Sequence, residues 1–168
     1  MGVAQGAAAA KISVTGKPHV MLVVFSLGGQ RFALPLHAVE RAVRAVEVQP
    51  LPGAPASVLG AIDVAGSVVP VYCASGWFGL RQREIHPDQQ LLLVRTSRSA
   101  VAMVIDEALG VIEFPADEIT PPDAIVPGLE RLQGVASLPD GMVLIHDLEK
   151  FLSAPEAAQL AQALEHAA

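Results

Sequence analysis

One stretch in the middle of the chain limits the possible folds more than any other, namely Leu59–Val71, which reads LGAIDVAGSVVPV. Two short runs rich in β-branched residues flank Gly66, which can adopt a positive φ. Apolar alternation on both sides of such a glycine is the pattern of a β-hairpin. Proline is uncommon inside paired strands, so we expect the second strand to stop at Pro70.

Similar short runs recur along the whole chain, which has 14 glycines and 13 prolines in 168 residues. Closely spaced strands with frequent turn residues favour small β-barrels over a parallel α/β sheet. We therefore expect a mainly β fold with one helical turn near Cys73–Phe78 and a loop from Pro115 to Pro127. The expected strands cover residues 20–27, 31–36, the later part of 39–48, 59–70, 90–95, 100–105, 108–114, 132–138 and 142–145.

Composition changes along the chain predict three parts. Residues 1–18 are rich in Ala and Gly and lack periodicity, which indicates a flexible arm. Residues 19–152 form the folded part, and the polar stretch 81–89 is the expected seam between two halves. In residues 153–168, Ser153 and Glu156 fit a capping box, and Leu160 and Leu164 form an apolar stripe, so a short amphipathic helix is expected.

The charge and cysteine content exclude several classes of function. Net charge is −6 and 17% of residues are charged, so a basic nucleic-acid footprint is not expected. The longest apolar run, Val20–Phe25, is too short to span a bilayer, and no signal peptide is apparent. We therefore expect no direct membrane contact. The single cysteine, Cys73, rules out an intramolecular disulfide and fits a reducing cytoplasm.

No catalytic constellation is recognisable, so we expect no enzyme activity, no cofactor and no metal. A hydrolase using Cys73 or His146 is disfavoured, because a complete nucleophile, base and orienting group is missing. Cys73 fits better as a small buried residue. The acidic cluster after residue 112 does not have the spacing of an EF-hand loop and fits a solvated loop. Trp77-Phe78 fits either an exposed binding anchor or the cap of a barrel end.

Five segments in order resemble the CheW-like family. The central stretch resembles the family signature G-v-I-N-x-R-G-x-v-x-P-V, with Asp63 in place of Asn and Ala65 in place of Arg. The other four segments are Phe25–Leu36 (FSLGGQRFALPL), Pro50–Pro55 (PLPGAP), Val104–Val111 (VIDEALGV) and Gly134–Leu148, which ends in LIHDL. Together the five cover about residues 19–152.

The resemblance implies two packed five-stranded SH3-like β-barrels with an apolar groove between them. It implies a noncatalytic adaptor that couples the cytoplasmic tip of a chemoreceptor to the regulatory domain of a CheA-type histidine kinase in a chemotaxis-like pathway. By resemblance, the receptor groove maps to Ile62, Asp63, Val64, Ala65, Gly66 and Val68. A secondary partner surface maps to Glu40 and Arg41, where the family usually carries v-E-I.

Two considerations leave the identity of the binding partner open. Ala65 replaces a cationic residue of the signature and Asp63 adds a negative charge, which predicts weakened binding to a conventional receptor. The alternative function is a small-ligand-binding module that uses the apolar groove between the barrels. Thermal shifts would separate the two, because a ligand module responds to small molecules and an adaptor to a protein partner.

Overall fold

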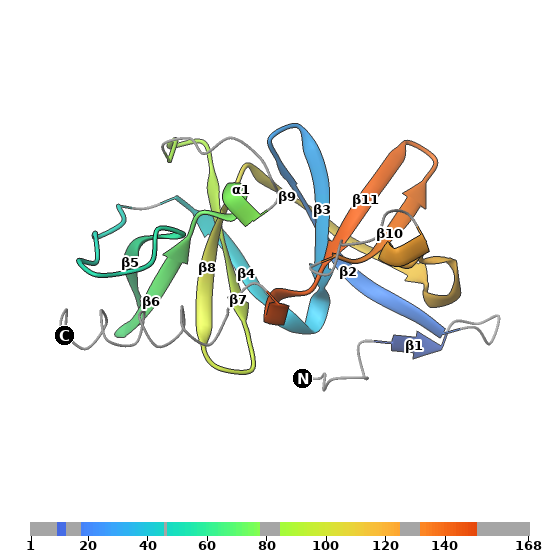
Figure 1. Ribbon diagram of the computed structural model, residues 1–168, viewed down its shortest axis with the longest axis horizontal. Helices are drawn as coiled ribbons and strands as arrows, with labels where there is room; N and C mark the ends of the chain where they lie inside the picture. Colours follow the sequence, from blue (N-terminus) through green and yellow to red (C-terminus); the bar gives the residue numbers. More distant parts are fainter. Residues whose placement is uncertain (1–9, 13–17, 46, 78–84, 125–131, 151–168) are drawn as a thin grey trace. The chain divides into compact units, whose positions relative to one another are not determined.

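The computed structural model describes residues 10–12, 18–45, 47–77, 85–124 and 132–150. Within these ranges the structure is mainly β, as predicted, and the α-helix found there is the single turn α1 (Ala74–Trp77) (Figure 1). The predicted C-terminal helix, residues 153–168, lies outside the described residues. The strands are β1 (Ala10–Ile12), β2 (Pro18–Leu27), β3 (Gln30–Pro35), β4 (Val39–Arg44), β5 (Val58–Val64), β6 (Ser67–Tyr72), β7 (Gln90–Arg95), β8 (Ala100–Ile105), β9 (Glu107–Pro115), β10 (Leu132–Leu138) and β11 (Gly141–His146).

The chain forms two compact units, and their boundary corrects the predicted seam. Unit 1 contains Met1–Val39 and Glu107–Leu148, and unit 2 contains Glu40–Asp106 and the segment from Glu149 on. The described part of the polar stretch, residues 85–89, therefore lies within unit 2, and the units are not two sequential halves. Sequence polarity cannot reveal this arrangement, because strand pairing joins segments that are far apart in the chain.

Unit 1 is built on a sheet with the strand order β9-β2-β3-β11-β10, to which β1 adds a sixth strand beside β2. Neighbouring strands are antiparallel except β3 and β11, which pair in parallel at Phe32 and Leu144. The core on this sheet is aliphatic apart from Phe114 and consists of Leu22, Val24, Ala33, Phe114, Ala136, Val143 and Ile145.

Unit 2 has the strand order β4-β7-β8-β6-β5, which completes the predicted pair of five-stranded sheets. Here β6 and β8 form the parallel pair, at Val71 and Ala102. The central strand β8 is buried at every position from Val101 to Ile105, and it pairs with β7 on one edge and with β6 on the other. The core cluster is Ile62, Val69, Val71, Leu91, Leu93, Ala102 and Val104.

Two local predictions need correction. Residues 10–12 belong to the predicted arm but form β1, which pairs with Pro18–Val20 of β2. β3 pairs with β2 only from Leu22 onward, so this part of the β2 edge is left for β1. The second correction is that β6 does not stop at Pro70 but continues to Tyr72. Pro70 is tolerated because pairing with β8 begins only at Val71, where β6 gains its second neighbour.

Candidate functional site

The β5–β6 hairpin carries most of the predicted partner-binding residues, and its turn has two residues. Val64 and Ser67 form the last pair, so Ala65 and Gly66 alone make the turn. Both have positive φ, 51° and 89°, as a type I′ turn requires. The sequence indicated the glycine, but Ala65 is an unexpected residue at the first position because its Cβ disfavours this backbone conformation.

Asp63 supports this turn. Its Oδ1 accepts a hydrogen bond of 2.8 Å from the backbone N–H of Gly66. An asparagine, which the family signature carries at this position, has the same acceptor oxygen. Asp63 therefore has a structural role in the turn in addition to any contact with a partner.

The predicted groove residues divide between the two faces of the hairpin. Ile62 is 7% exposed and belongs to the core of unit 2, and its assignment to the receptor groove stays a prediction. Asp63 and Val68 lie opposite each other on the outer face, where Val68 is 57% exposed. Val64 is half-buried on the inner face. The division follows from the two-residue period of strands.

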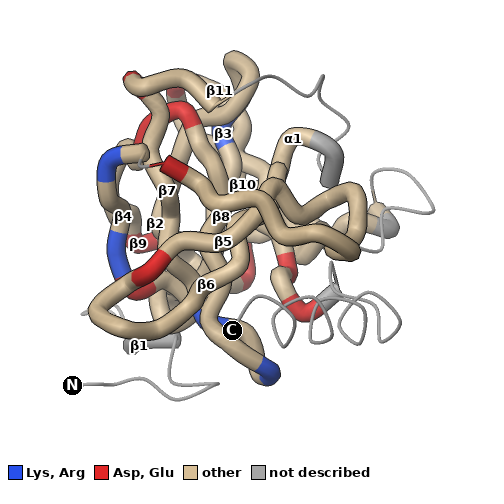
Figure 2. Tube along the Cα trace, turned by 90° about the vertical axis from the view of Figure 1, so that its left-hand side faces the viewer, with Lys and Arg blue, Asp and Glu red and all other residues tan. Residues whose placement is uncertain are grey.

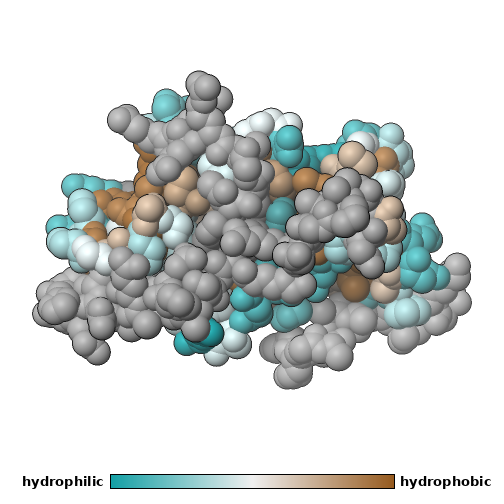
Figure 3. Space-filling view, in the orientation of Figure 1, coloured by the Kyte–Doolittle hydropathy of each residue, from teal (hydrophilic) through white to brown (hydrophobic). Residues whose placement is uncertain are grey.

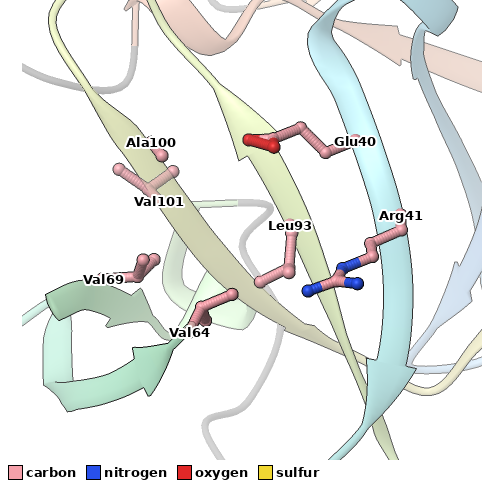
Figure 4. Close-up of a pocket in the computed structure, with 7 residues that line it drawn as sticks. All are labelled: Glu40, Arg41, Val64, Val69, Leu93, Ala100 and Val101. Carbon is pink, nitrogen blue, oxygen red and sulfur yellow. The ribbon is translucent and has the colours of Figure 1, made fainter. Parts of the chain in front are cut away.

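A pocket of about 280 Å³ lies beside the inner face of this hairpin (Figure 4). It brings Val64 of β5 together with Glu40 and Arg41 of β4, so the primary and the secondary predicted surfaces meet there. The sequence did not indicate the remaining lining residues, which are Val69 of β6, Leu93 of β7, and Ala100 and Val101 of β8. Their apolar types mark them as core, and no local signal distinguishes a pocket wall from a core.

The two charged residues of the pocket differ in their partners. Glu40 accepts a hydrogen bond from Arg95 at the end of β7, with 3.2 Å between Oε1 and Nη2. The structure describes no carboxylate paired with Arg41, whose guanidinium points from β4 toward Leu93 (Figure 4). The pocket therefore combines apolar walls with a cation that has no acidic partner in the described part of the chain.

The pocket predicted between the two barrels stays a prediction, because all residues of the described pocket belong to unit 2. Elsewhere on the surface, basic residues are spread singly along the trace (Figure 2), and apolar atoms form small patches separated by polar ones (Figure 3). Across the described ranges, no helix is long and apolar enough to cross a membrane.

The surroundings of the residues considered for catalysis or metal binding indicate a structural role. Cys73 is buried, and the ring of buried His146 packs against Phe32 at a centroid distance of 5.3 Å. Among the described residues, no three His, Cys, Asp or Glu side chains gather to hold a metal ion. The side chains of Trp77 and Phe78 lie outside the part of the structure that is described.

Comparison with known proteins gives a consistent result. The chemotaxis protein CheW of Treponema pallidum is 25% identical over 146 residues, covering 83% of this chain and 86% of that protein. Protein FrzA of Myxococcus xanthus is 26% identical over 111 residues, 66% of this chain and 69% of that protein. The crystal structure of the scaffolding protein TtCheW from Thermoanaerobacter tengcongensis matches with a TM-score of 0.69 and 25% identity, over 76% of this chain and 88% of that one.

The match to a family covers most of the chain. Residues 21–156 match the CheW-like domain. This range includes the β5–β6 hairpin and the whole described pocket. The chain therefore belongs to the CheW-like family.

Proposed function

We propose that this chain is a noncatalytic cytoplasmic adaptor that couples a chemoreceptor to a CheA-type histidine kinase in a chemotaxis-like pathway. The observation that carries the proposal is the CheW-like domain over residues 21–156, whose central signature forms a hairpin with an exposed turn beside a pocket that has apolar walls and two charged residues. Relatives named chemotaxis protein CheW and a structural neighbour named a scaffolding protein support it.

The pocket favours a protein partner over the small-ligand alternative. Its volume of about 280 Å³ is at the lower end of small-ligand sites, which hold roughly 300–1,000 Å³. Such a space suits one or two side chains projecting from a partner. A pocket next to an exposed turn also offers the partner a second point of contact, since Asp63, Ala65 and Val68 are accessible there.

The test is reconstitution with a receptor cytoplasmic fragment and the regulatory domain of the kinase from the same organism. We expect a ternary complex by size-exclusion chromatography and separate binary affinities by calorimetry. Kinase activity in receptor-containing membranes should depend on the added adaptor. Failure to bind either protein at concentrations well above micromolar would reject the proposal.

The replaced signature residue leads to a finer proposal about affinity. Ala65 is exposed at the tip of the turn, where an arginine could reach a carboxylate or carbonyl of the receptor. Losing one charge-assisted hydrogen bond costs roughly 1.5–3 kcal/mol, about one to two orders of magnitude in affinity. We therefore propose that this chain binds a conventional receptor tip weakly.

The measurement is titration of a conventional receptor fragment with the wild type, Ala65→Arg and Ala65→Gln. Glutamine controls for the strain of a longer side chain at positive φ. Tighter binding by the arginine variant alone supports the proposal. Equal affinities of the three proteins would show that the turn does not set receptor affinity.

A further inference from the structure

Arg41 lies at an unusual position on its strand. It shares a face of β4 with Val43, which packs against the core of unit 2, whereas Ala42 and Arg44 lie on the opposite face. Arg41 is nevertheless exposed, and its side chain lines the pocket (Figure 4). A cation on the core-facing side of a strand is uncommon, and here the pocket accommodates it.

Of the two charged residues that line the pocket, Glu40 has an ion-pair partner among the described residues and Arg41 has none. Arg95 pairs with Glu40 at 3.2 Å, and both side chains are partly exposed. Asp63 is directed to the turn, where it accepts the N–H of Gly66. No ion pair of Arg41 occurs within the described residues. An approaching partner therefore meets one guanidinium that is free to form a bidentate contact with a carboxylate.

The wall below the guanidinium is aliphatic. Val64, Val69, Leu93 and Val101 supply most of the lining. An aliphatic side chain entering this space would replace water with close apolar contacts, while a carboxylate beside it would reach the guanidinium at the rim. The two requirements together define a short recognition element of an aliphatic residue next to Asp or Glu.

We propose that Arg41 determines the specificity of this pocket for an acidic partner segment, one that inserts an aliphatic side chain and places a neighbouring Asp or Glu on the guanidinium. The inference rests on the proposed function, because the partner segment is taken to belong to the receptor. It concerns a residue in which this chain departs from the v-E-I of its family, so the charge preference of the pocket is its own.

The experiment uses the full-length chain and a chemoreceptor cytoplasmic fragment from the same organism, with affinity measured by calorimetry. Arg41→Gln removes the charge, Arg41→Lys keeps the charge without the planar fork, and Arg44→Glu is the matched control on the opposite face of β4. We expect Arg41→Gln to bind about tenfold more weakly, which is the lower end for a charge-assisted hydrogen bond. Arg41→Lys should fall between it and the wild type, and Arg44→Glu within about twofold of the wild type.

A charge exchange gives the decisive result. Each Asp or Glu of the fragment that neighbours an aliphatic residue is changed singly to Arg, and binding to Arg41→Glu is measured. The inference expects one such change to restore binding to Arg41→Glu while weakening binding to the wild type. Circular dichroism and thermal melts of all variants establish that they remain folded.

The outcomes separate the two proposals. If the wild type does not bind the fragment, receptor coupling fails and the inference fails with it. If the wild type binds but Arg41→Gln and Arg41→Glu bind equally well, the adaptor function stands and the role of Arg41 is overturned. If Arg44→Glu weakens binding as much as Arg41→Glu does, the effect is a general surface charge and the pocket is not the determinant.

Discussion

Units 1 and 2 share one strand plan despite different positions in the sequence. The order β9-β2-β3-β11-β10 corresponds strand by strand to β4-β7-β8-β6-β5, and the third and fourth strands of each are the parallel pair. The register also shifts at equivalent places, between Val58 and Gly60 in β5 and between Leu132 and Gly134 in β10. The units differ in their turns, so the common plan sets the core while the turns distinguish the surfaces.

The turns of unit 1 are short or braced within the unit. The β2–β3 turn consists of Gly28 and Gly29, both with positive φ. The β10–β11 turn contains Asp140, which accepts a hydrogen bond of 3.2 Å from Arg31 of β3. Neither turn lines the described pocket.

The turns of unit 2 are held differently. Ser97, in the β7–β8 loop, donates from both its backbone N–H and its hydroxyl to the carboxylate of Glu149, at 2.7 and 2.5 Å. The β5–β6 turn has only the local support of Asp63 and presents exposed residues beside the pocket. The same sheet plan thus places an exposed hairpin turn beside a pocket in unit 2.

The space at each register shift, or bulge, in β5 and β10 can be tested by adding a methyl group at its glycine. Gly60→Ala would place a Cβ against the backbone carbonyl of Gln49 at a φ of 155°, whereas Gly134→Ala meets mainly the movable side chain of Ile119. We expect a loss of roughly 3–5 kcal/mol at Gly60 and roughly 1–3 kcal/mol at Gly134. Urea unfolding measures both. Equal losses would mean that the two bulges are equivalent in energy as well as in register.

The hydrogen bonds of Ser97 to Glu149, which hold the β7–β8 loop, should make a moderate contribution to the free energy of unfolding. Ser97→Ala keeps the backbone hydrogen bond to Glu149 and removes the hydroxyl one, and Glu149→Gln removes the charge of the acceptor. Because Ser97 is exposed, we expect each change to cost only about 1 kcal/mol. Thermal unfolding of both variants is the measurement, with Ser99→Ala as a control in the same loop. A control as destabilising as Ser97→Ala would contradict a specific brace.

The β5–β6 hairpin should become more stable when Ala65 is replaced by a residue that tolerates a positive φ. Ala65→Asn places at φ 51° a residue that tolerates this region, and we expect about 0.5–1 kcal/mol of added stability. The thermal midpoint reports it. A lower midpoint for Ala65→Asn would show that the turn is not limited by the backbone preference of residue 65.

The ion pair of unit 1 should give the smallest effect. Asp140 is 75% exposed in its side chain and Arg31 is 26% exposed, so solvent screens their attraction. We expect Asp140→Asn to cost about 0.5 kcal/mol at low salt and less at high salt. Unfolding at two ionic strengths measures this. A cost that does not depend on salt would identify a packing contribution of Arg31 instead.

Local signals predicted the elements well. β7, β8 and β10 have the expected bounds, because each is an apolar run limited by polar or turn residues. The hairpin around Gly66 and the single helical turn after Cys73 also follow from residues close together in the chain. The errors at Pro70 and at residues 10–12 arose where a neighbouring strand, rather than local preference, decides whether a residue is paired.

The candidate site was only partly predictable. The resemblance pointed to the hairpin and to Glu40 and Arg41, and these do come together at one pocket. It did not indicate Leu93 or Val101, and Ile62, which it assigned to the groove, is 7% exposed and does not line this pocket. A motif identifies positions, but the side of the sheet on which each one lies depends on the register.

The sequence by itself determined the β content, the tight turns and the membership in a family, because the two-residue period and the positions of Gly and Pro act over a few residues. Only the tertiary structure decided that residues 1–39 and 107–148 form one unit, that β3 meets β11 and β6 meets β8, and that Arg41 faces a pocket walled by four other strands. These features depend on hydrogen bonds and burial between segments distant in the chain, which no short stretch of residues encodes.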